Sequence, residues 1–142
     1  MTAMTDTVRR YLSALASGDL EGMAACCTAT AVVVSPVYGT VPARSFFEQL
    51  HADTVSANVE IIAIYAADDR SGRVIAHFRY QWERRSGIKI DTNVLDLFEF
   101  APDARIERLK IVLDVHADEE IIKDSDAGSP QPDQIIAARN GH

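Results

Sequence analysis

The spacing of apolar residues near the N-terminus predicts an amphipathic helix over residues 5–16. Val8, Tyr11, Leu12 and Leu15 recur at i, i+3, i+4 and i+7, which places them on one face of a helix. That face must turn towards the interior of the protein, since its opposite side is polar. The pattern therefore predicts that the Tyr11 ring points inward.

Turn signals after this segment predict two more helices. Gly18 suits the left-handed position that ends the first helix, and Asp19 can cap a second helix over residues 19–27. A third helix is expected over residues 42–52, because a proline is tolerated in a first helical turn and two phenylalanines and a leucine supply an apolar side. The N-terminal half is thus predicted to be largely helical.

From residue 57 the apolar period changes from helical to alternating, which is typical of strands. Short segments rich in Asp, Ser, Gly and Pro separate the alternating runs and suit hairpin turns. Three helices followed by an antiparallel meander indicate an α+β fold. The runs predicted as strands are residues 59–61, 74–75, 76–84, 88–100 and 106–115.

Length and composition favour one domain with a tail. A chain of 142 residues with 47% hydrophobic residues suits a single core, and we place that domain at residues 1–118. Residues 119–142 are predicted to form a partly mobile tail, because the run DSDAGSPQP has little capacity for burial. A short helix over residues 133–140 is the one element expected there.

Charge and apolar content exclude several classes of partner. The net charge is −7 and the 14 basic residues form no long block, so we expect no nucleic-acid binding. No apolar stretch approaches the roughly 20 residues that span a bilayer, and the N-terminus lacks the core of a signal peptide. We therefore expect a cytoplasmic protein without membrane contact.

The chain shows no signal for a metal or a cofactor. Cys26 and Cys27 are adjacent, which is poor placement for a disulfide between them, and we expect reduced core thiols. The four histidines are scattered singly, so no metal site is predicted. Glycine-rich phosphate loops are missing from the sequence, so no nucleotide cofactor is expected.

The phrase YLSALASGD, the order of elements and the strand pair in DLFEFAPDARIERLKIVLD resemble the nuclear-transport-factor-2-like superfamily, which includes ketosteroid isomerases and SnoaL-type polyketide cyclases. The resemblance covers roughly residues 4–115. It implies a cone in which a strongly curved antiparallel sheet wraps three N-terminal helices around a deep apolar pocket. The superfamily hosts isomerases, dehydratases, epoxide hydrolases, cyclases and non-catalytic proteins, so fold membership selects none of these activities.

Two residues match the oxyanion site of the ketosteroid isomerases. Tyr11 is similar in position to the tyrosine that donates to the substrate oxyanion, and Asp96 in VLDLFEF matches its protonated aspartic acid partner. Val94, Asp96 and Phe98 share one face of a strand by period two, so apolar neighbours should raise the pKa of the Asp96 carboxyl. The alternatives are a core tyrosine with another acceptor and an aspartate on the solvent face.

The general-base aspartate of those isomerases would fall on Ser35, whose unassisted hydroxyl is a poor base. A standard steroid isomerase is therefore disfavoured. Asp114, which ends IVLD, resembles the water-activating aspartate of limonene epoxide hydrolases, with Asp96 as the second acid. The arginine that bridges the two acids in those enzymes is replaced by Val94. The alternative for Asp114 is a strand-end acid that faces water.

The run over residues 76–84 places aromatic and polar residues on opposite faces of a strand. In the isomerase-like alignment the aromatic face lines the pocket, where flat rings suit a steroid, polyketide or terpenoid. His77 falls on the outer face, at a dimer interface or in solvent, and plain core packing is the alternative for the rings. The residues predicted to line the pocket are Phe46, Phe78, Tyr80, Trp82, Val94, Phe98 and Leu113.

The leading hypothesis is a cofactor-free homodimer that binds or transforms a small hydrophobic carbonyl compound through Tyr11 and Asp96. As an enzyme it would be an isomerase or cyclase. One alternative is a non-catalytic binding or accessory dimer that keeps the pocket without a base. A second is an epoxide-hydrolase-like enzyme that uses Asp96 and Asp114, and a third is a structural dimerisation domain whose cavity is filled by its own side chains.

Overall fold

The computed structural model describes residues 2–114 of the 142-residue chain. The predicted tail at 119–142, its helix at 133–140 and the domain boundary at 118 lie outside the described residues. No helix within residues 2–114 is long and apolar enough to cross a membrane.

The three predicted helices are present, and local capping explains where the first two begin and end. The Thr2 hydroxyl accepts a hydrogen bond from the Thr5 backbone N–H at 3.1 Å, and Gly18 ends the first helix with a φ of 69°. The Asp19 carboxylate accepts from the Gly22 N–H at 2.9 Å and caps the second helix. The helices are α1 (Ala3–Ser17), α2 (Leu20–Ala25) and α3 (Ala43–Asp53).

Within residues 2–114, six strands form one sheet in the order β2-β1-β6-β5-β4-β3. All neighbouring pairs are antiparallel except β1 and β6, which run parallel. The predicted α+β class and curved sheet are confirmed. The strands are β1 (Cys27–Ser35), β2 (Gly39–Pro42), β3 (Thr54–Ala66), β4 (Val74–Arg84), β5 (Lys89–Phe100) and β6 (Ile106–Leu113).

The structure differs from the sequence-based expectations in residues 26–42. Strands β1 and β2 were not predicted, and the second helix was extended to residue 27 although it ends at Ala25. In β1 both Val33 and Val34 are buried, so the strand lacks the alternation that identifies a half-exposed strand. As a result, the sheet is not a simple meander, because β1 lies beside β6 at the other end of the described chain.

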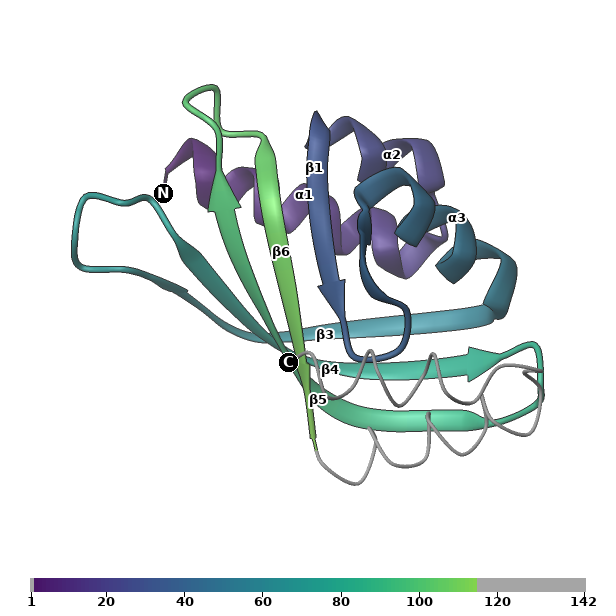
Figure 1. The fold of residues 1–142 in the computed structure, drawn as a ribbon. Coiled ribbons are helices and arrows are strands. Elements are labelled where there is room, and N and C mark those ends of the chain that lie inside the picture. Colours follow the sequence, from purple (N-terminus) through teal and green to yellow (C-terminus); the bar gives the residue numbers. More distant parts are fainter. Residues whose placement is uncertain (1, 115–142) are drawn as a thin grey trace.

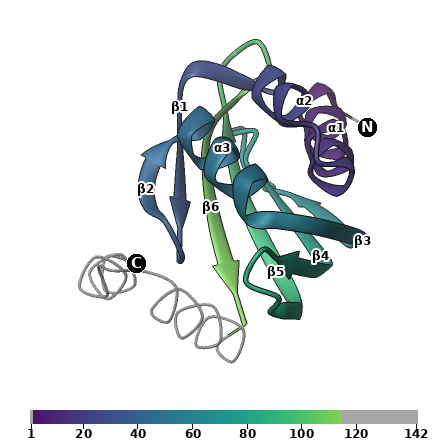
Figure 2. The ribbon, with the colours of Figure 1, turned by 90° about the vertical axis from the view of Figure 1, so that its right-hand side faces the viewer.

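The sheet curves around the helices. Figure 1 shows β3 running across the direction of β1 and β6 and passing behind β6, with the helices behind and beside β1. Figure 2 shows the three helices gathered on the same side of the curved sheet. The inward face of α1 packs there, with Val8 and Leu12 almost fully buried. Burial of each such side chain stabilises the fold by about 1.5–3 kcal/mol, so the core holds α1 firmly in place.

Candidate functional site

A cavity of about 60 Å³ lies between the helices and the concave face of the sheet. Nine of the residues predicted for the site line it, namely Tyr11, Ser35, Phe46, Phe78, Tyr80, Trp82, Val94, Asp96 and Leu113. The sequence did not point to the others, which are Leu15, Pro36, Val37, Tyr38, Leu50, Ile90, Thr92 and Ile111. Of these, Thr92 had a usable signal, because it shares the inward face of β5 with Asp96 by period two.

The volume limits what this cavity holds without rearrangement. An apolar cavity of about 150 Å³ accommodates benzene, whereas this one measures about 60 Å³. Even a ligand with a single ring therefore fits only if lining side chains move or if part of the ligand lies outside the cavity.

Tyr11 and Asp96 lie in the wall of this cavity, on α1 and β5. Tyr11 is 1% exposed and Asp96 2% exposed. The Tyr11 ring is fixed by Phe98 and Phe47, with ring centroids at 5.7 and 5.9 Å. Among the described residues, neither the Tyr11 hydroxyl nor the Asp96 carboxyl has a hydrogen-bond partner. The cavity wall thus contains two buried polar groups without a hydrogen-bond partner among the described residues.

The environment keeps both groups protonated at neutral pH. Burial raises the pKa of the Asp96 carboxyl from 3.8 to about 8, since the ionised form is poorly solvated there. Burial, followed by the nearby Asp96 charge, raises the pKa of Tyr11 well above its usual value. Both side chains therefore present an O–H donor to the cavity.

The alternation of β5 explains how a carboxyl reaches the interior. Thr92, Val94 and Phe98 are buried with Asp96, whereas Leu95 on the opposite face is exposed. This is the period-two arrangement that the sequence indicated. A shift of one residue in register would place Asp96 in solvent.

Ser35 stabilises the turn that follows β1. Its side-chain oxygen accepts hydrogen bonds from the backbone N–H groups of Val37 at 3.0 Å and Tyr38 at 3.1 Å. A hydroxyl oxygen has two lone pairs, so both are occupied by the turn between β1 and β2. This arrangement leaves Ser35 unable to accept a proton from a ligand, although its own proton can be donated.

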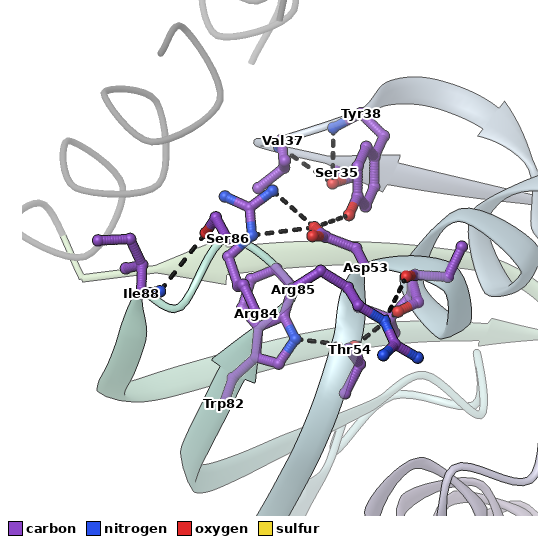
Figure 3. Close-up of polar contacts among 12 residues, drawn as sticks. Ser35, Val37, Tyr38, Asp53, Thr54, Trp82, Arg84, Arg85, Ser86 and Ile88 are labelled. Carbon is purple, nitrogen blue, oxygen red and sulfur yellow. Dashed lines mark hydrogen bonds and ion pairs between the residues drawn. The ribbon is translucent and has the colours of Figure 1, made fainter. Parts of the chain in front are cut away.

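A largely buried ion pair between Arg84 and Asp53 lies next to Tyr38 and Trp82 of the cavity lining (Figure 3). Arg84 donates to Asp53 Oδ2 from Nη2 at 2.6 Å and from Nε at 2.9 Å. The Tyr38 hydroxyl donates to the same oxygen at 2.7 Å, and the guanidinium carbon lies 4.9 Å from the centroid of the Trp82 ring. We call Tyr38, Asp53 and Arg84 the paired cluster.

The aromatic face of β4 is buried, as the alternation indicated, but its two polar rings differ. The Trp82 Nε1–H donates to Thr54 Oγ1 at 2.8 Å, and that hydroxyl donates to the Leu50 carbonyl at 2.6 Å (Figure 3). The Tyr80 hydroxyl is buried and has no partner within residues 2–114. The Tyr80 ring stacks on Trp82 with centroids 5.9 Å apart.

Three other candidate residues lie away from the cavity. Phe98 is buried against Tyr11 and does not line the hollow. Asp114 follows β6, is exposed and is not part of the lining, so the structure does not bring it to the cavity beside Asp96. His77 lies on the outer face of the sheet, where its Nε2 is 3.1 Å from Asn93 Oδ1.

Neither cysteine has reactive character. Cys26 and Cys27 are both buried and free, and burial raises the pKa of the Cys27 thiol to about 12. These are the buried, reduced thiols that the sequence indicated. Among the described residues, no group of three His, Cys, Asp or Glu side chains is placed to hold a metal ion.

The sequence profile of the SnoaL-like domain matches residues 8–109. The chain therefore belongs to the SnoaL-like domain family. No functionally curated protein matches the sequence.

Several solved structures share the fold. Bal32a, from a soil-derived mobile gene cassette, is 24% identical with a TM-score of 0.71, covering 84% of this chain and 95% of its own. SalBIII, an epoxide hydrolase/cyclase-like enzyme in pyran ring formation in the polyether salinomycin, is 16% identical with a TM-score of 0.69 over 80% and 92% of the two chains. A protein of unknown function from Burkholderia pseudomallei K96243 is 16% identical, with a TM-score of 0.70 over 87% and 97%.

Proposed function

We propose that this protein binds a small hydrophobic carbonyl compound in its cavity, with the carbonyl oxygen held by the Tyr11 hydroxyl and the un-ionised Asp96 carboxyl. One observation supports this most directly: both groups are buried, protonated at neutral pH, unpaired among the described residues, and in the wall of one apolar cavity. Buried polar groups otherwise have partners, so a ligand oxygen is the missing acceptor.

Catalysis of the isomerase or cyclase type follows from the same two donors. A carbonyl oxygen that gains negative charge in a transition state is stabilised by fixed donors in a water-poor site, typically by about 3 kcal/mol per donor. A carboxyl with a pKa of about 8 can also deliver a proton near neutral pH. In a ring closure where a substrate hydroxyl attacks the carbonyl carbon, Asp96 gives its proton to the carbonyl oxygen, and the resulting carboxylate takes up the proton that the attacking hydroxyl loses.

A non-catalytic binding protein is the second candidate, and Ser35 favours it. The position of the isomerase base is occupied by a hydroxyl whose lone pairs already accept two backbone N–H groups. The described residues that line the cavity include no ionisable group besides Asp96 and three tyrosines. The two-acid epoxide hydrolase is less well supported, since Asp114 is exposed and outside this lining.

We also propose that the protein is a homodimer that pairs through the outer face of its sheet. Ile75, Leu95 and Val112 project there from β4, β5 and β6 and are 36%, 38% and 39% exposed. The register places Leu95 beside both His77 and Val112, so these apolar side chains form part of a continuous surface. Sedimentation of the parent and of Leu95→Glu tests this, and a parent that sediments as a monomer rejects it.

Titration calorimetry with 4-nitrophenol tests the oxyanion site, because its phenolate mimics an enolate. We expect Tyr11→Phe and Asp96→Leu each to weaken binding about tenfold or more, the loss of about 1.4 kcal/mol. The matched control is Tyr65→Phe, which removes the hydroxyl of a tyrosine that is 56% exposed on β3. Equal affinity in the parent and both site variants would reject the proposal.

A further inference from the structure

A second hollow, a groove of about 470 Å³, lies on the helix side of the cavity. It is bounded by the end of α1, the end of α3 and the first residues of β3, and Figure 1 shows α3 leading directly into that strand. Leu15, Leu50 and Tyr80 line both the groove and the cavity. Three side chains therefore form the partition between the small apolar cavity and the larger groove.

The groove is basic in an acidic protein. Among the described residues, its lining contains Arg85 and His51 and no acidic residue, although the chain carries 21 Asp and Glu residues and a net charge of −7. Such local concentration of one sign of charge in a hollow attracts ligands of the opposite sign.

Arg85 is fixed against the end of α3. Its backbone N–H donates to the Asp53 carbonyl at 2.8 Å, and its Nε donates to the Ala52 carbonyl at 3.2 Å (Figure 3). Among the described residues, the Arg85 guanidinium has no carboxylate partner. Its terminal amino groups are thus available to an anion, and guanidinium groups bind carboxylates with two parallel hydrogen bonds.

Tyr80 supplies an independent observation at the partition. Its hydroxyl is buried and lacks a partner within residues 2–114, while Trp82 and Phe78 pack on its ring with centroids at 5.9 and 6.1 Å. An orphan hydroxyl on a fixed ring destabilises the free protein. The hydroxyl gains its missing partner when a ligand oxygen reaches this point.

We propose that the cavity and the groove form one elongated site for an apolar ligand with a carbonyl at one end and a carboxylate at the other. The carbonyl end lies at Tyr11 and Asp96, Tyr80 donates to a ligand oxygen at the partition, and Arg85 pairs with the carboxylate in the groove. The inner end of this site rests on the proposed function. The arrangement explains how a cavity of about 60 Å³ serves a larger molecule, since Leu15 and Leu50 can change rotamer to open the partition.

The test compares three probes by titration calorimetry: phenol, phenols with alkyl tails of increasing length that end in a carboxylate, and the primary amides of those acids. For the tail length that reaches the groove, we expect the acid to bind the parent about tenfold tighter than its amide. Arg85→Gln should remove this advantage and leave phenol binding unchanged. Arg70→Gln, which makes the same change of charge in the turn after β3, should keep the advantage.

The second variant is Tyr80→Phe, probed with tailed phenols that carry an oxygen at successive positions along the chain. For the probe whose oxygen reaches the partition, we expect affinity to fall about fivefold. The melting temperature of the free protein should hold or rise, because the variant removes an unpaired buried hydroxyl. A lower melting temperature with unchanged affinity for every probe would assign Tyr80 a purely structural role and overturn its part in the site.

The outcomes separate this inference from the proposed function. If phenol binding depends on Tyr11 but acids bind no better than amides at any length, the groove is not part of the site and the inference is overturned. An acid advantage that survives Arg85→Gln has the same consequence. Suppose that the affinity for phenol is unchanged in Tyr11→Phe, while the preference for the acid over its amide is lost in Arg85→Gln. The groove is then an anion subsite and the proposed function fails. If no probe binds, both are overturned.

Discussion

Two groups of polar side chains at the cavity differ in whether they have hydrogen-bond partners within the protein. At the paired cluster, Tyr38 and Arg84 both donate to the Asp53 carboxylate at 2.6 to 2.9 Å. Tyr11 and Asp96, in the cavity wall, are buried more deeply, but no described residue forms a hydrogen bond with them.

The contrast separates side chains that stabilise the fold from those that we propose to bind a ligand. Folding recovers the desolvation cost of the paired cluster through its own hydrogen bonds, while the cost at Tyr11 and Asp96 is left uncompensated. A fold retains such a cost where function needs it, so we expect chemistry or binding at Tyr11 and Asp96.

The largest predicted effect comes from removing the carboxylate of the paired cluster. Asp53→Ala should lower the free energy of unfolding by about 3–5 kcal/mol, because it leaves the Arg84 charge buried without this carboxylate and Tyr38 without its acceptor. The control is Asp91→Ala, whose pair with Arg79 is about half exposed and should cost less than about 1 kcal/mol. Urea denaturation measures both, and equal losses would contradict the contrast drawn above.

The next prediction concerns Asp96 and pH. Asp96 has a folded pKa of about 8 against 3.8 when unfolded, so in this pH range the folded protein holds a proton that the unfolded chain releases. Its contribution to stability is complete below about pH 4 and is lost as the pH rises through about 8. Since one proton changes stability by at most about 1.4 kcal/mol per pH unit, the loss from pH 5 to 8 should be just under about 4 kcal/mol.

The Asp96→Asn variant isolates this effect from other titrating groups. It should show a flatter dependence of unfolding free energy on pH over the same interval, measured by urea denaturation at each pH. An unchanged slope would mean that Asp96 is ionised in the folded protein and is no donor.

The smallest predicted effect is at Ser35. Ser35→Ala leaves the Val37 and Tyr38 N–H groups without their acceptor and should cost about 1–3 kcal/mol. Ser35→Asp keeps an oxygen acceptor at the turn and should recover most of that stability. A fully stable alanine variant would show that the turn does not need this hydroxyl, and would reopen a role for Ser35 in ligand chemistry.

Local periodicity predicted the parts of the site that lie on regular elements. The helical spacing of residues 5–16 placed Tyr11 in the core, and alternation along β5 placed Asp96 on the inward face. Each prediction needed only one element and one buried face. The same reasoning placed His77 on the outer face.

What the sequence did not reveal depends on contacts between distant segments. The paired cluster joins a turn residue, the last residue of α3 and the last residue of β4. Helical and strand periodicity act within one element, so neither could predict this contact. The groove arises where helix ends meet β3, which only the three-dimensional packing determines. Strand β1 was missed because tertiary pairing with β6, rather than alternation, stabilises it.

The parallel pairing of β1 with β6 has a consequence for synthesis on the ribosome. Val33 in β1 lies opposite Leu109 in β6, and β6 also carries Ile111 and Leu113 of the cavity lining. The pairing joins residues far apart along the chain, so closing this loop is entropically expensive and slow. A nascent chain that stops before Ile106 therefore lacks β6 and the part of the cavity wall that β6 supplies, so we expect the cavity to form only once translation has passed Leu113.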